Sequence, residues 1–379
     1  VSKVEDGQIV VQVPSFRSDL TREIDLIEEV GRLNGFDNLD AILPSGQLGY
    51  RHEPSGTLPD GRQPIVSPVR LNAVERVRDL LADEGLREAV NFSFISEAAL
   101  ASLRFSDDDL RAQGAPIANP LSEEWAVLRT TLLPGLLKNL SHHLAHQETN
   151  VRLFEIGPVF PPDASFETGV GRQLKLSILL WGDRPERWSA EPASETVFDL
   201  KAAVESVLGE LAVEAVLENH GGTIPYLHPG AGARILLGDQ QIGEFGVLHP
   251  EISQGLDVEG EVMVAELDLQ TLLDNERAVT QYAAIARYPA TSRDLALVVE
   301  SGTAFGDVER AMREFNNPLI ESIDLSSVYE GAPIPEGKKS IALAVTYRSD
   351  SGSLTDKKVD KIHDRLAQHV LQQLGATLR

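Results

Sequence analysis

The order of predicted secondary structure in the last 93 residues is the feature that most restricts how this chain can fold. Apolar residues at alternate positions predict β-strands, and apolar residues three and four positions apart predict helices. Here the patterns predict strand, helix, strand, strand, helix and a short last strand, over residues 294–300, 305–315, 320–330, 338–348, 355–374 and 376–379. Such a unit can bury one face of its sheet under two helices.

The βαββαβ order is that of a ferredoxin-like fold. Side chains alternate along a strand, so the third long strand has two different faces. The apolar face carries Ile341, Leu343, Val345 and Tyr347, and the other carries Ser340, Ala342, Ala344, Thr346 and Arg348. The first face can hold both helices, and the second is flat and polar enough to accept a ligand.

Charge is distributed unevenly along the chain. Residues 287–379 carry 12 Lys and Arg against 13 Asp and Glu, whereas the remaining 286 residues carry 22 against 45. Nearly all of the net charge of −24 therefore lies outside the C-terminal stretch. A polyanion such as RNA would be repelled by the acidic body and tolerated mainly at the C-terminal end.

The composition excludes several classes of protein. With 42% hydrophobic and 24% charged residues, the chain is typical of a globular protein, and 379 residues can form two or three cores. The lack of cysteine excludes disulfides, thiolate metal sites and cysteine catalysis. No apolar run reaches the ~18 residues of a membrane helix. We expect a cytoplasmic protein, and the start at Val1 without a signal peptide indicates a missing N-terminal portion.

The rest of the chain divides into two segments. A strand at 8–13 and a helix at about 20–33 precede residues 44–68, which are rich in Pro and Gly and predict a linker. A larger α/β segment follows, to about residue 285, with hairpin-like turns such as 238–241 that favour a mainly antiparallel sheet. Its predicted helices are 69–84, 132–146 and 197–211, and its predicted strands are 90–95, 151–156, 174–181, 234–237, 242–248 and 262–267. The expected fold class is multidomain α+β.

Four carboxylates near the N-terminus form a candidate metal site. Asp25, Glu28 and Glu29 are spaced i, i+3 and i+4, so they share a helix face opposite the apolar stripe. Asp19, at the helix start, reaches them only if the N-terminal turn bends back. A hard cation such as Mg²⁺ would relieve their repulsion through oxygen ligation. A solvated acidic face near a helix N-terminus is the commoner explanation of such spacing alone.

Histidine motifs give weaker indications of chemistry. His142, His143 and His146 include an i, i+4 pair of the kind that binds zinc, but no Glu follows the first His as a general base. We therefore expect partly exposed polar residues on a helix. The His-Pro pairs at His228 and His249 adjoin strand-like runs, and turn formation accounts for them. The sequence contains no nucleophile elbow, P-loop or strand-borne dinucleotide-binding motif.

The last predicted helix carries a basic stripe. Lys357, Lys361 and Arg365 lie at i, i+4 and i+8 and can contact phosphates. Asp360 and Asp364 interleave with them, so a salt-bridged solvent face explains the pattern at least as well.

Three groups of motifs, in collinear order, are more specific than these patterns. The first is Asn119-Pro120-Leu121-Ser122, Leu128-Arg129-Thr130-Thr131-Leu132-Leu133-Pro134-Gly135-Leu136-Leu137 and Leu153-Phe154-Glu155-Ile156-Gly157. The second is Phe198-Asp199-Leu200-Lys201, His228-Pro229-Gly230 and Gly246-Val247-Leu248-His249-Pro250. The third is Tyr288-Pro289, Arg293-Asp294-Leu295, Tyr329-Glu330-Gly331, Lys338-Lys339-Ser340 and the ending Leu374-Gly375-Ala376-Thr377-Leu378-Arg379. In these motifs the chain resembles the β subunit of bacterial phenylalanine–tRNA ligase over essentially its whole length.

The resemblance implies three parts joined by a linker at 45–68. Residues 1–44 resemble part of the family's B5 domain, and residues 69–285 a class II synthetase-like B6–B7 module with an antiparallel sheet. Residues 287–379 resemble a ferredoxin-fold anticodon-binding domain. The family's N-terminal tRNA-binding domain, its B3/B4 editing region and the start of B5 have no counterpart here. Hydrolysis of mischarged tyrosyl-tRNA, which the family places in B3/B4, is therefore not expected.

In this family the catalytic work belongs to the α subunit of an α₂β₂ enzyme. A class II active site needs Arg residues on its antiparallel strands to hold ATP and to stabilise charge during adenylation. The strand from Arg152 to Glu155 resembles one such strand, but 243–248 has no Arg and runs into His249-Pro250. We expect a non-catalytic module that packs against the α subunit.

The resemblance also assigns ligands. Asp19, Asp25, Glu28 and Glu29 match the family's D-x5-D-x2-E-E ligands for Mg²⁺, at a site shared with the α subunit. Arg348 and the basic stripe become candidate contacts to tRNA(Phe). The implied function is to support ATP-dependent attachment of phenylalanine to tRNA. The alternatives are a stand-alone RNA-binding or scaffold protein derived from a synthetase, and a free-standing ligase, which the missing Arg disfavours.

Overall fold

The computed structural model describes residues 2–5, 8–40, 68–184, 188, 191, 193–276, 282 and 284–379. The chain divides into two compact units, Val1–Pro68 and Val69–Arg379. Almost all of the linker predicted at 45–68 lies outside the described residues, as do residues 41–44. Across the part of the chain that the structure describes, no helix combines the length and the apolar character needed to cross a bilayer.

The first unit contains a hairpin and one long helix. Strands β1 (Ser2–Glu5) and β2 (Gln8–Val11) pair antiparallel, and helix α1 (Glu23–Asn34) is followed by the 3-10 turn η1 (Phe36–Asn38). The helix begins later than the apolar pattern predicts, because Asp25 accepts hydrogen bonds from the backbone N–H groups of Thr21 and Arg22 and so caps the first turn. It ends where predicted, at Gly35 with φ +86°.

The middle module is built on a seven-stranded sheet with strand order β3-β6-β7-β11-β10-β9-β8. All neighbouring strands are antiparallel except β3 and β6, which confirms the predicted mainly antiparallel sheet. The strands are β3 (Arg87–Glu88), β6 (Asn150–Val159), β7 (Gln173–Gly182), β8 (Val216–Asn219), β9 (Leu227–Leu237), β10 (Gln240–Leu248) and β11 (Val262–Leu267).

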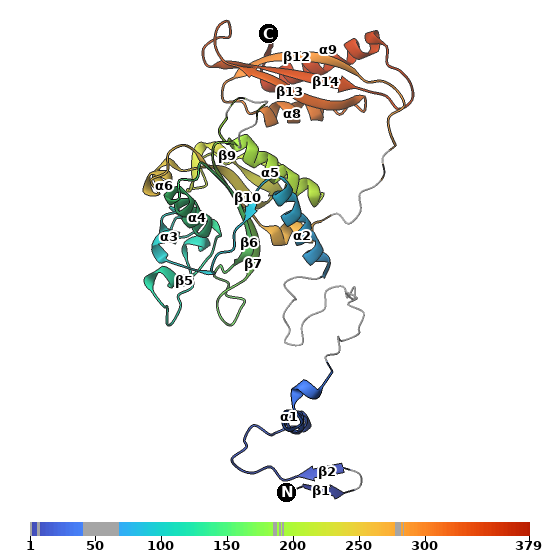
Figure 1. Cartoon of the computed structure of the whole chain (residues 1–379). Helices are drawn as coiled ribbons and strands as arrows, with labels where there is room; N and C mark the ends of the chain where they lie inside the picture. The colour runs from blue at the N-terminus through green and yellow to red at the C-terminus, as the bar shows by residue number, and fades with distance from the viewer. Residues whose placement is uncertain are drawn as a thin grey trace. The chain divides into compact units, whose positions relative to one another are not determined.

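Helices cover both faces of this sheet, as Figure 1 shows. Alternation along the strands sends Ile178 into one apolar core and its neighbour Leu179 into the other. The first core includes residues of α2 (Pro68–Asp83), α5 (Val197–Glu210) and α7 (Leu269–Asp274); the second includes residues of α4 (Leu133–Ala145) and α6 (Pro250–Gly255). Shorter elements lie along the chain between α2 and α4, namely β4 (Phe94–Ile95), α3 (Glu97–Ala101), η2 (Leu110–Ala112), η3 (Glu123–Trp125) and β5 (Val127–Leu128).

Two predictions about this module are wrong in detail. The strand predicted at 90–95 is reduced to β4, which pairs with β5, because the backbone before it bonds instead to β6 and to Arg129. The turn predicted at His228-Pro229-Gly230 lies inside strand β9. The register of β9 with β10 shifts between Gly246 and Leu248, and this irregularity accommodates the proline.

The C-terminal module has the predicted ferredoxin-like order. Its sheet is antiparallel with strand order β13-β14-β12-β15, and helices α8 and α9 share its core. The elements are β12 (Thr291–Glu300), α8 (Phe305–Glu314), β13 (Ile320–Tyr329), β14 (Lys338–Tyr347), α9 (Asp356–Leu374) and β15 (Thr377–Leu378). The predicted apolar face of β14 is confirmed, since Ile341, Leu343, Val345 and Tyr347 all belong to the core. On the opposite face Ser340 is buried as well, at 1% exposure.

Candidate functional site

A row of polar residues crosses the middle sheet from strand to strand. Each member is the register partner of the next, on the sheet face that also carries Leu153, Leu179 and Val264 toward α4. The row, called the polar row below, consists of Glu155, Ser177, Glu266, Glu244, Arg234 and Glu218. A buried sheet face with this many ionisable groups is the natural place to look for chemistry.

Glu155 forms a buried ion pair with Arg129. The Arg129 Nη1 to Glu155 Oε1 distance is 2.6 Å, and the two side chains are 4% and 2% exposed. Glu155 also accepts a hydrogen bond from Asn91 Nδ2 at 2.7 Å, and Arg129 Nε donates to the carbonyl oxygen of Pro158. A paired charge of this kind holds structure together and leaves no free donor for a ligand.

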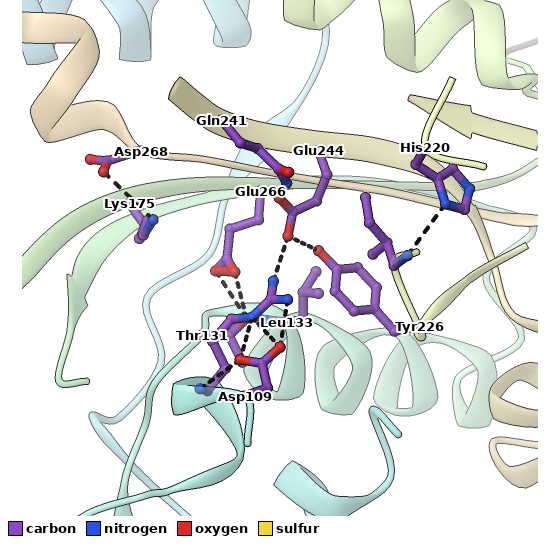
Figure 2. A network of polar contacts seen from close by, with 12 residues as sticks. Asp109, Thr131, Leu133, Lys175, His220, Tyr226, Gln241, Glu244, Glu266 and Asp268 are labelled. Atoms are coloured by element: carbon purple, nitrogen blue, oxygen red, sulfur yellow. Dashed lines mark hydrogen bonds and ion pairs between the residues drawn. The ribbon is translucent and has the colours of Figure 1, made fainter. Parts of the chain in front are cut away.

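Glu266 is held by the start of helix α4. Its carboxylate accepts hydrogen bonds from the Thr131 hydroxyl at 2.7 Å and from the Leu132 N–H at 2.9 Å. Burial raises the pKa of Glu266, and the charge of Lys175 partly opposes that shift. Lys175 itself lies 3.8 Å from Asp268. Figure 2 shows both groups beside the sheet.

Glu244 is surrounded by three donors, one of them from its own strand β10. It accepts hydrogen bonds from the Tyr226 hydroxyl and from Gln241 Nε2, both at 2.7 Å, and forms an ion pair with Arg111 at 2.5 Å. Figure 2 shows Tyr226 and Gln241 converging on this carboxylate. The Arg111 guanidinium also pairs with Asp109 and lies over the Phe105 ring, 4.5 Å from its centroid. Burial raises the pKa of the Tyr226 hydroxyl.

The charged side chains of the polar row are therefore paired within the chain, although the buried Arg234 Nε has no hydrogen-bond partner among the described residues. At its far end Arg234 pairs with Glu218 at 2.9 Å, so every charged side chain of the row has a partner. An ATP site would need uncommitted cationic groups for the phosphates. Within the described residues, none of the arginines on this face is left for that purpose.

Arg152 and Glu155, predicted from sequence to resemble a catalytic strand, lie on opposite faces of the sheet. Arg152 reaches the carbonyl oxygen of Glu84, just after α2, and pairs with Glu195 at 2.6 Å. Their separation by three residues along one strand places them on different faces. Arg152 therefore lies on the sheet face opposite the polar row and does not contact it.

The four N-terminal carboxylates divide into different roles. Asp19 and Glu29 both contact Arg17 Nη2, at 2.7 Å and 2.6 Å, so the turn before α1 bends back and brings them to one cation. Arg17 and Arg32 hold the pKa of Glu29 down to about 2. In the described residues, no group of three or more potential ligands is close enough to hold a metal.

The other two carboxylates of this set, Asp25 and Glu28, lie in α1 before Glu29. The cap bonds from Thr21 and Arg22 lower the pKa of Asp25. Among the described residues, the one partner of its second oxygen, Oδ1, is the exposed Arg22 side chain, at 3.2 Å. Glu28 is exposed to solvent. Asp19 and Glu29 thus share one cation already, whereas Glu28 is exposed and the Asp25 side chain is 13% exposed.

The histidine motifs have local structural roles. His142 and His146 lie near the end of α4 with ring centroids 4.3 Å apart, and His146 Nδ1 bonds the carbonyl oxygen of His142. His249 caps α6 by accepting a hydrogen bond from the Glu251 N–H. His228 accepts one from the Gly230 N–H.

The basic stripe lies on the outward side of α9. Lys357, Lys361 and Arg365 are exposed, and no ion pair joins them to another described residue. The interleaved Asp360 pairs with Arg293 of β12 at 2.9 Å. Arg348 is different, because it is engaged with Glu321 at 2.8 Å and with the carbonyl oxygen of Tyr288.

The open face of the C-terminal sheet carries three residues that belong to the sequence motifs but were assigned no role from sequence. Tyr329 ends β13 with its ring 43% exposed, and the Arg379 guanidinium lies 5.6 Å from the ring centroid. The register partner of Tyr329 is Ser340, whose buried hydroxyl has no hydrogen-bond partner. An aromatic ring, a cation and a free hydroxyl thus meet at one end of this face. Strand alternation could have placed Tyr329 and Ser340 together, but not Arg379 beside them.

Comparisons with protein families show which class of protein this chain resembles. Residues 1–36 match the tRNA synthetase B5 domain, and residues 286–379 match the ferredoxin-fold anticodon binding domain. Residues 55–269, more than half of the chain, match the phenylalanyl tRNA synthetase beta chain CLM domain. These are domains of an aminoacyl-tRNA synthetase.

Individual relatives agree on the family. Phenylalanine–tRNA ligase beta subunits of Syntrophotalea carbinolica and Geobacter sulfurreducens are 34% and 36% identical over 100% and 99% of this chain. The chain spans 45% of the length of each. A pyrrolysyl-tRNA synthetase structure from Desulfitobacterium hafniense matches with a TM-score of 0.42 and 18% identity, over 54% of this chain and 67% of that one. The chain belongs to the phenylalanyl-tRNA synthetase beta chain family.

Proposed function

We propose that this chain supports phenylalanine–tRNA ligase activity in the cytoplasm without catalysing the reaction itself. It assembles with the catalytic alpha subunit into an α₂β₂ enzyme that attaches phenylalanine to tRNA(Phe) at the expense of ATP. The observation that carries the proposal is the closed polar row. Its arginines are committed to Glu244, Glu155 and Glu218, so adenylate formation must take place on another chain.

The C-terminal module contributes recognition of the tRNA anticodon region. A nucleobase can stack on the exposed ring of Tyr329, because base–aromatic stacking tolerates any base. Arg379 offers a positive charge beside the same ring. Arg348, Lys357, Lys361 and Arg365 remain candidate contacts to the phosphate backbone.

The face at Tyr329 and the basic stripe are separate surfaces. Helix α9 packs in the core on the apolar side of the sheet, whereas Tyr329 and Ser340 belong to the other side. The first surface suits bases and the second suits phosphates, so variants of each should affect binding differently.

The N-terminal carboxylates fit a magnesium site by their chemistry. Mg²⁺ takes oxygen ligands, and two of the four carboxylates already meet at the guanidinium of Arg17. The exposed Glu28 adds an accessible carboxylate, and Asp25 lies on the same helix. Asp19, Asp25, Glu28 and Glu29 would therefore hold the ion, which would supply a fixed positive charge that ties this unit to the alpha subunit.

Assembly and activity are tested together. The chain is mixed with its cognate alpha subunit, the mixture is resolved by size-exclusion chromatography with light scattering, and tRNA aminoacylation is assayed on the complex. The expected result is a heteromeric complex with activity that neither chain has alone. An active chain without alpha, or a chain that binds tRNA but never alpha, would contradict the proposal.

The magnesium site is tested by direct binding. Asp25→Asn with Glu28→Gln removes two charges but leaves an acceptor at the helix cap, and Glu23→Gln on the same helix is the matched control. Electron paramagnetic resonance with Mn²⁺ in place of Mg²⁺ should show bound ion in the wild type and the control, and at least a tenfold loss of affinity in the double variant. Equal binding by all three would remove this site from the proposal.

A further inference from the structure

Two histidines lie on the solvent side of helix α4, at its C-terminal end. His142 is in the last turn and His146 is the C-cap residue, four positions later, so their side chains share one helix face. Both are exposed, whereas Leu140 and Leu144 of the same helix pack in the core. The two ring centroids are 4.3 Å apart. The two residues are called the histidine pair below.

A hydrogen bond fixes the tautomer of His146. Its Nδ1 lies 2.8 Å from the carbonyl oxygen of His142, and because a carbonyl oxygen can only accept, Nδ1 carries the proton. In the neutral ring the lone pair is therefore on Nε2, which forms no hydrogen bond to another described residue. Histidines that bind metal ions usually donate their other ring N–H to a carbonyl or carboxylate oxygen in the same way.

The ring of His142 is free of hydrogen bonds. Across the described residues, neither of its ring nitrogens has a hydrogen-bond partner, and its ring contacts are with His143 and His146. Two nitrogens on one tetrahedral ion lie ~3.3 Å apart when each bond is ~2.05 Å long. Rings whose centroids are 4.3 Å apart can each direct one nitrogen to that separation.

The backbone that carries the histidine pair is fixed by a Schellman motif. The Glu148 N–H donates to the carbonyl oxygen of His143 at 3.2 Å, and the Gln147 N–H donates to that of Leu144 at 2.9 Å. Gln147, with φ +61°, is the left-handed residue that this motif requires. Both rings therefore project from an ordered backbone, so an ion that binds them costs little conformational entropy.

Charge at this end of α4 favours a cation. The C-terminus of a helix is the negative end of its dipole. Residues 1–286, which include α4, carry 22 Lys and Arg against 45 Asp and Glu. The surrounding potential therefore attracts positive ions and repels anions such as phosphate.

The ligand atoms decide which cation is bound. Imidazole nitrogens suit Zn²⁺, Cu²⁺ and Ni²⁺, whereas Mg²⁺ and Ca²⁺ take oxygen ligands. His143 is beside His142 in the chain but faces another way, since adjacent helical residues do not share a face. No group of three His, Cys, Asp or Glu in the described part of the chain can hold a metal, so water would complete the coordination.

We propose that His142 and His146 form a binding site for a divalent metal ion that prefers nitrogen ligands, such as Zn²⁺. The bound ion links the last turn of α4 to its C-cap and stabilises the folded middle module. This inference goes beyond the proposed function and does not depend on it, because nitrogen ligands select a different ion from the one that the N-terminal carboxylates would take.

Copper binding to the full chain tests the site directly. Cu²⁺ is titrated in the presence of excess Mg²⁺, which occupies oxygen-ligand sites, and electron paramagnetic resonance resolves the splitting from nitrogen nuclei bound to the copper. The wild type should bind one Cu²⁺ through two nitrogens. His142→Ala and His146→Ala should each lose affinity by about tenfold or more, since one of the two protein ligands is removed. His143→Ala is the matched control and should retain both the affinity and the splitting.

Zinc-dependent stability provides a second test. An ion that binds the folded chain and not the unfolded one raises the stability of the folded chain. Zn²⁺ should therefore raise the urea midpoint of the wild type and of His143→Ala, and should leave that of the double variant His142→Ala with His146→Ala unchanged. The midpoints without Zn²⁺ show whether each variant folds.

Three results would overturn this inference. One is a wild-type chain that binds neither Cu²⁺ nor Zn²⁺, and another is equal binding by the wild type and the double variant, which would place the ion elsewhere. The third is a loss in His143→Ala as large as that in His142→Ala. None of these results bears on assembly with the alpha subunit, so the proposed function is tested separately.

Discussion

The two largest sheets among the described residues differ in how their polar residues are bonded. On the middle sheet, Glu155, Glu266 and Glu244 are buried and each is bonded to groups of the same chain. On the open face of the C-terminal sheet, the Ser340 hydroxyl has no partner, and the Tyr329 ring is exposed under Arg379. Polar density alone would have pointed to the middle sheet as the functional site. Because these three carboxylates are bonded within the chain, we propose instead that the middle sheet is a scaffold, since a committed group is not available to a ligand.

The largest expected effect comes from the buried ion pair between Arg129 and Glu155. Arg129→Ala leaves Glu155 buried without its partner, which should lower the free energy of unfolding by about 3–5 kcal/mol. All three tryptophans, Trp125, Trp181 and Trp188, lie in the middle segment, so urea denaturation followed by fluorescence reports on it. The control is Lys201→Ala, which removes an exposed ion pair with Glu205 on the same helix. This variant should change the free energy of unfolding by less than about 1 kcal/mol. Equal effects of the two variants would show that the polar row is not a structural network.

Removal of the exposed Tyr329 ring should weaken RNA binding without a change in the free energy of unfolding. Tyr329→Ala is expected to reduce affinity for tRNA(Phe) by about tenfold, since stacking of one base contributes ~1–3 kcal/mol. Leu325→Ala, on the same strand and 44% exposed, is the matched control. Fluorescence anisotropy of labelled tRNA(Phe) measures both. If the two variants bind equally well, the open face is not the base-binding surface.

The pH dependence of the free energy of unfolding tests whether the pKa of Glu266 is raised in the folded chain. Burial raises its folded-state pKa above the unfolded value of about 4.3. Its stabilising contribution is therefore fully present below that unfolded value and is lost as the pH rises through the folded pKa. Glu266→Gln removes this dependence but keeps an acceptor for the Leu132 N–H. The wild type should thus lose stability relative to the variant between acid and neutral pH, as measured by urea midpoints. Parallel pH profiles would contradict the raised pKa.

The basic stripe gives the smallest expected effect. If Lys357 and Lys361 contact phosphates, their replacement by Ala should lower the slope of log affinity against log salt by about 0.7–0.9 for each contact. The control is Lys201→Ala on α5, in the middle module. Anisotropy titrations from low to physiological salt measure the slope. An unchanged slope would leave the helix side of the module outside the RNA interface.

Sequence periodicity predicted much of the fold. Alternation gave the two faces of β14 correctly, and Gly35 marked the end of α1, because both signals depend on neighbouring residues alone. The strand predicted at 90–95 failed because Val90 and Phe92 alternate like strand residues but have no neighbouring strand within the described chain. Backbone pairing depends on distant residues, which a local pattern does not contain.

The functional residues were harder to predict. The missing arginine of 243–248 indicated a non-catalytic module, but Arg111, which neutralises Glu244, lies 133 residues away in the chain. The contact of the Arg379 guanidinium with the Tyr329 ring likewise depends on the fold, because β15 and β13 lie at opposite edges of the sheet. The spacing of Asp25, Glu28 and Glu29 placed them on one helix, yet it could not reveal that Arg17 would reach Glu29.

The central claim is that the middle sheet has no catalytic capacity of its own. Pyrophosphate exchange into ATP, dependent on phenylalanine and Mg²⁺, measures adenylate formation directly. The account predicts no exchange above background for this chain alone, because its polar row offers no free cation to ATP, and exchange whenever the alpha subunit is present. Phenylalanine-dependent exchange by this chain in the absence of alpha would contradict it.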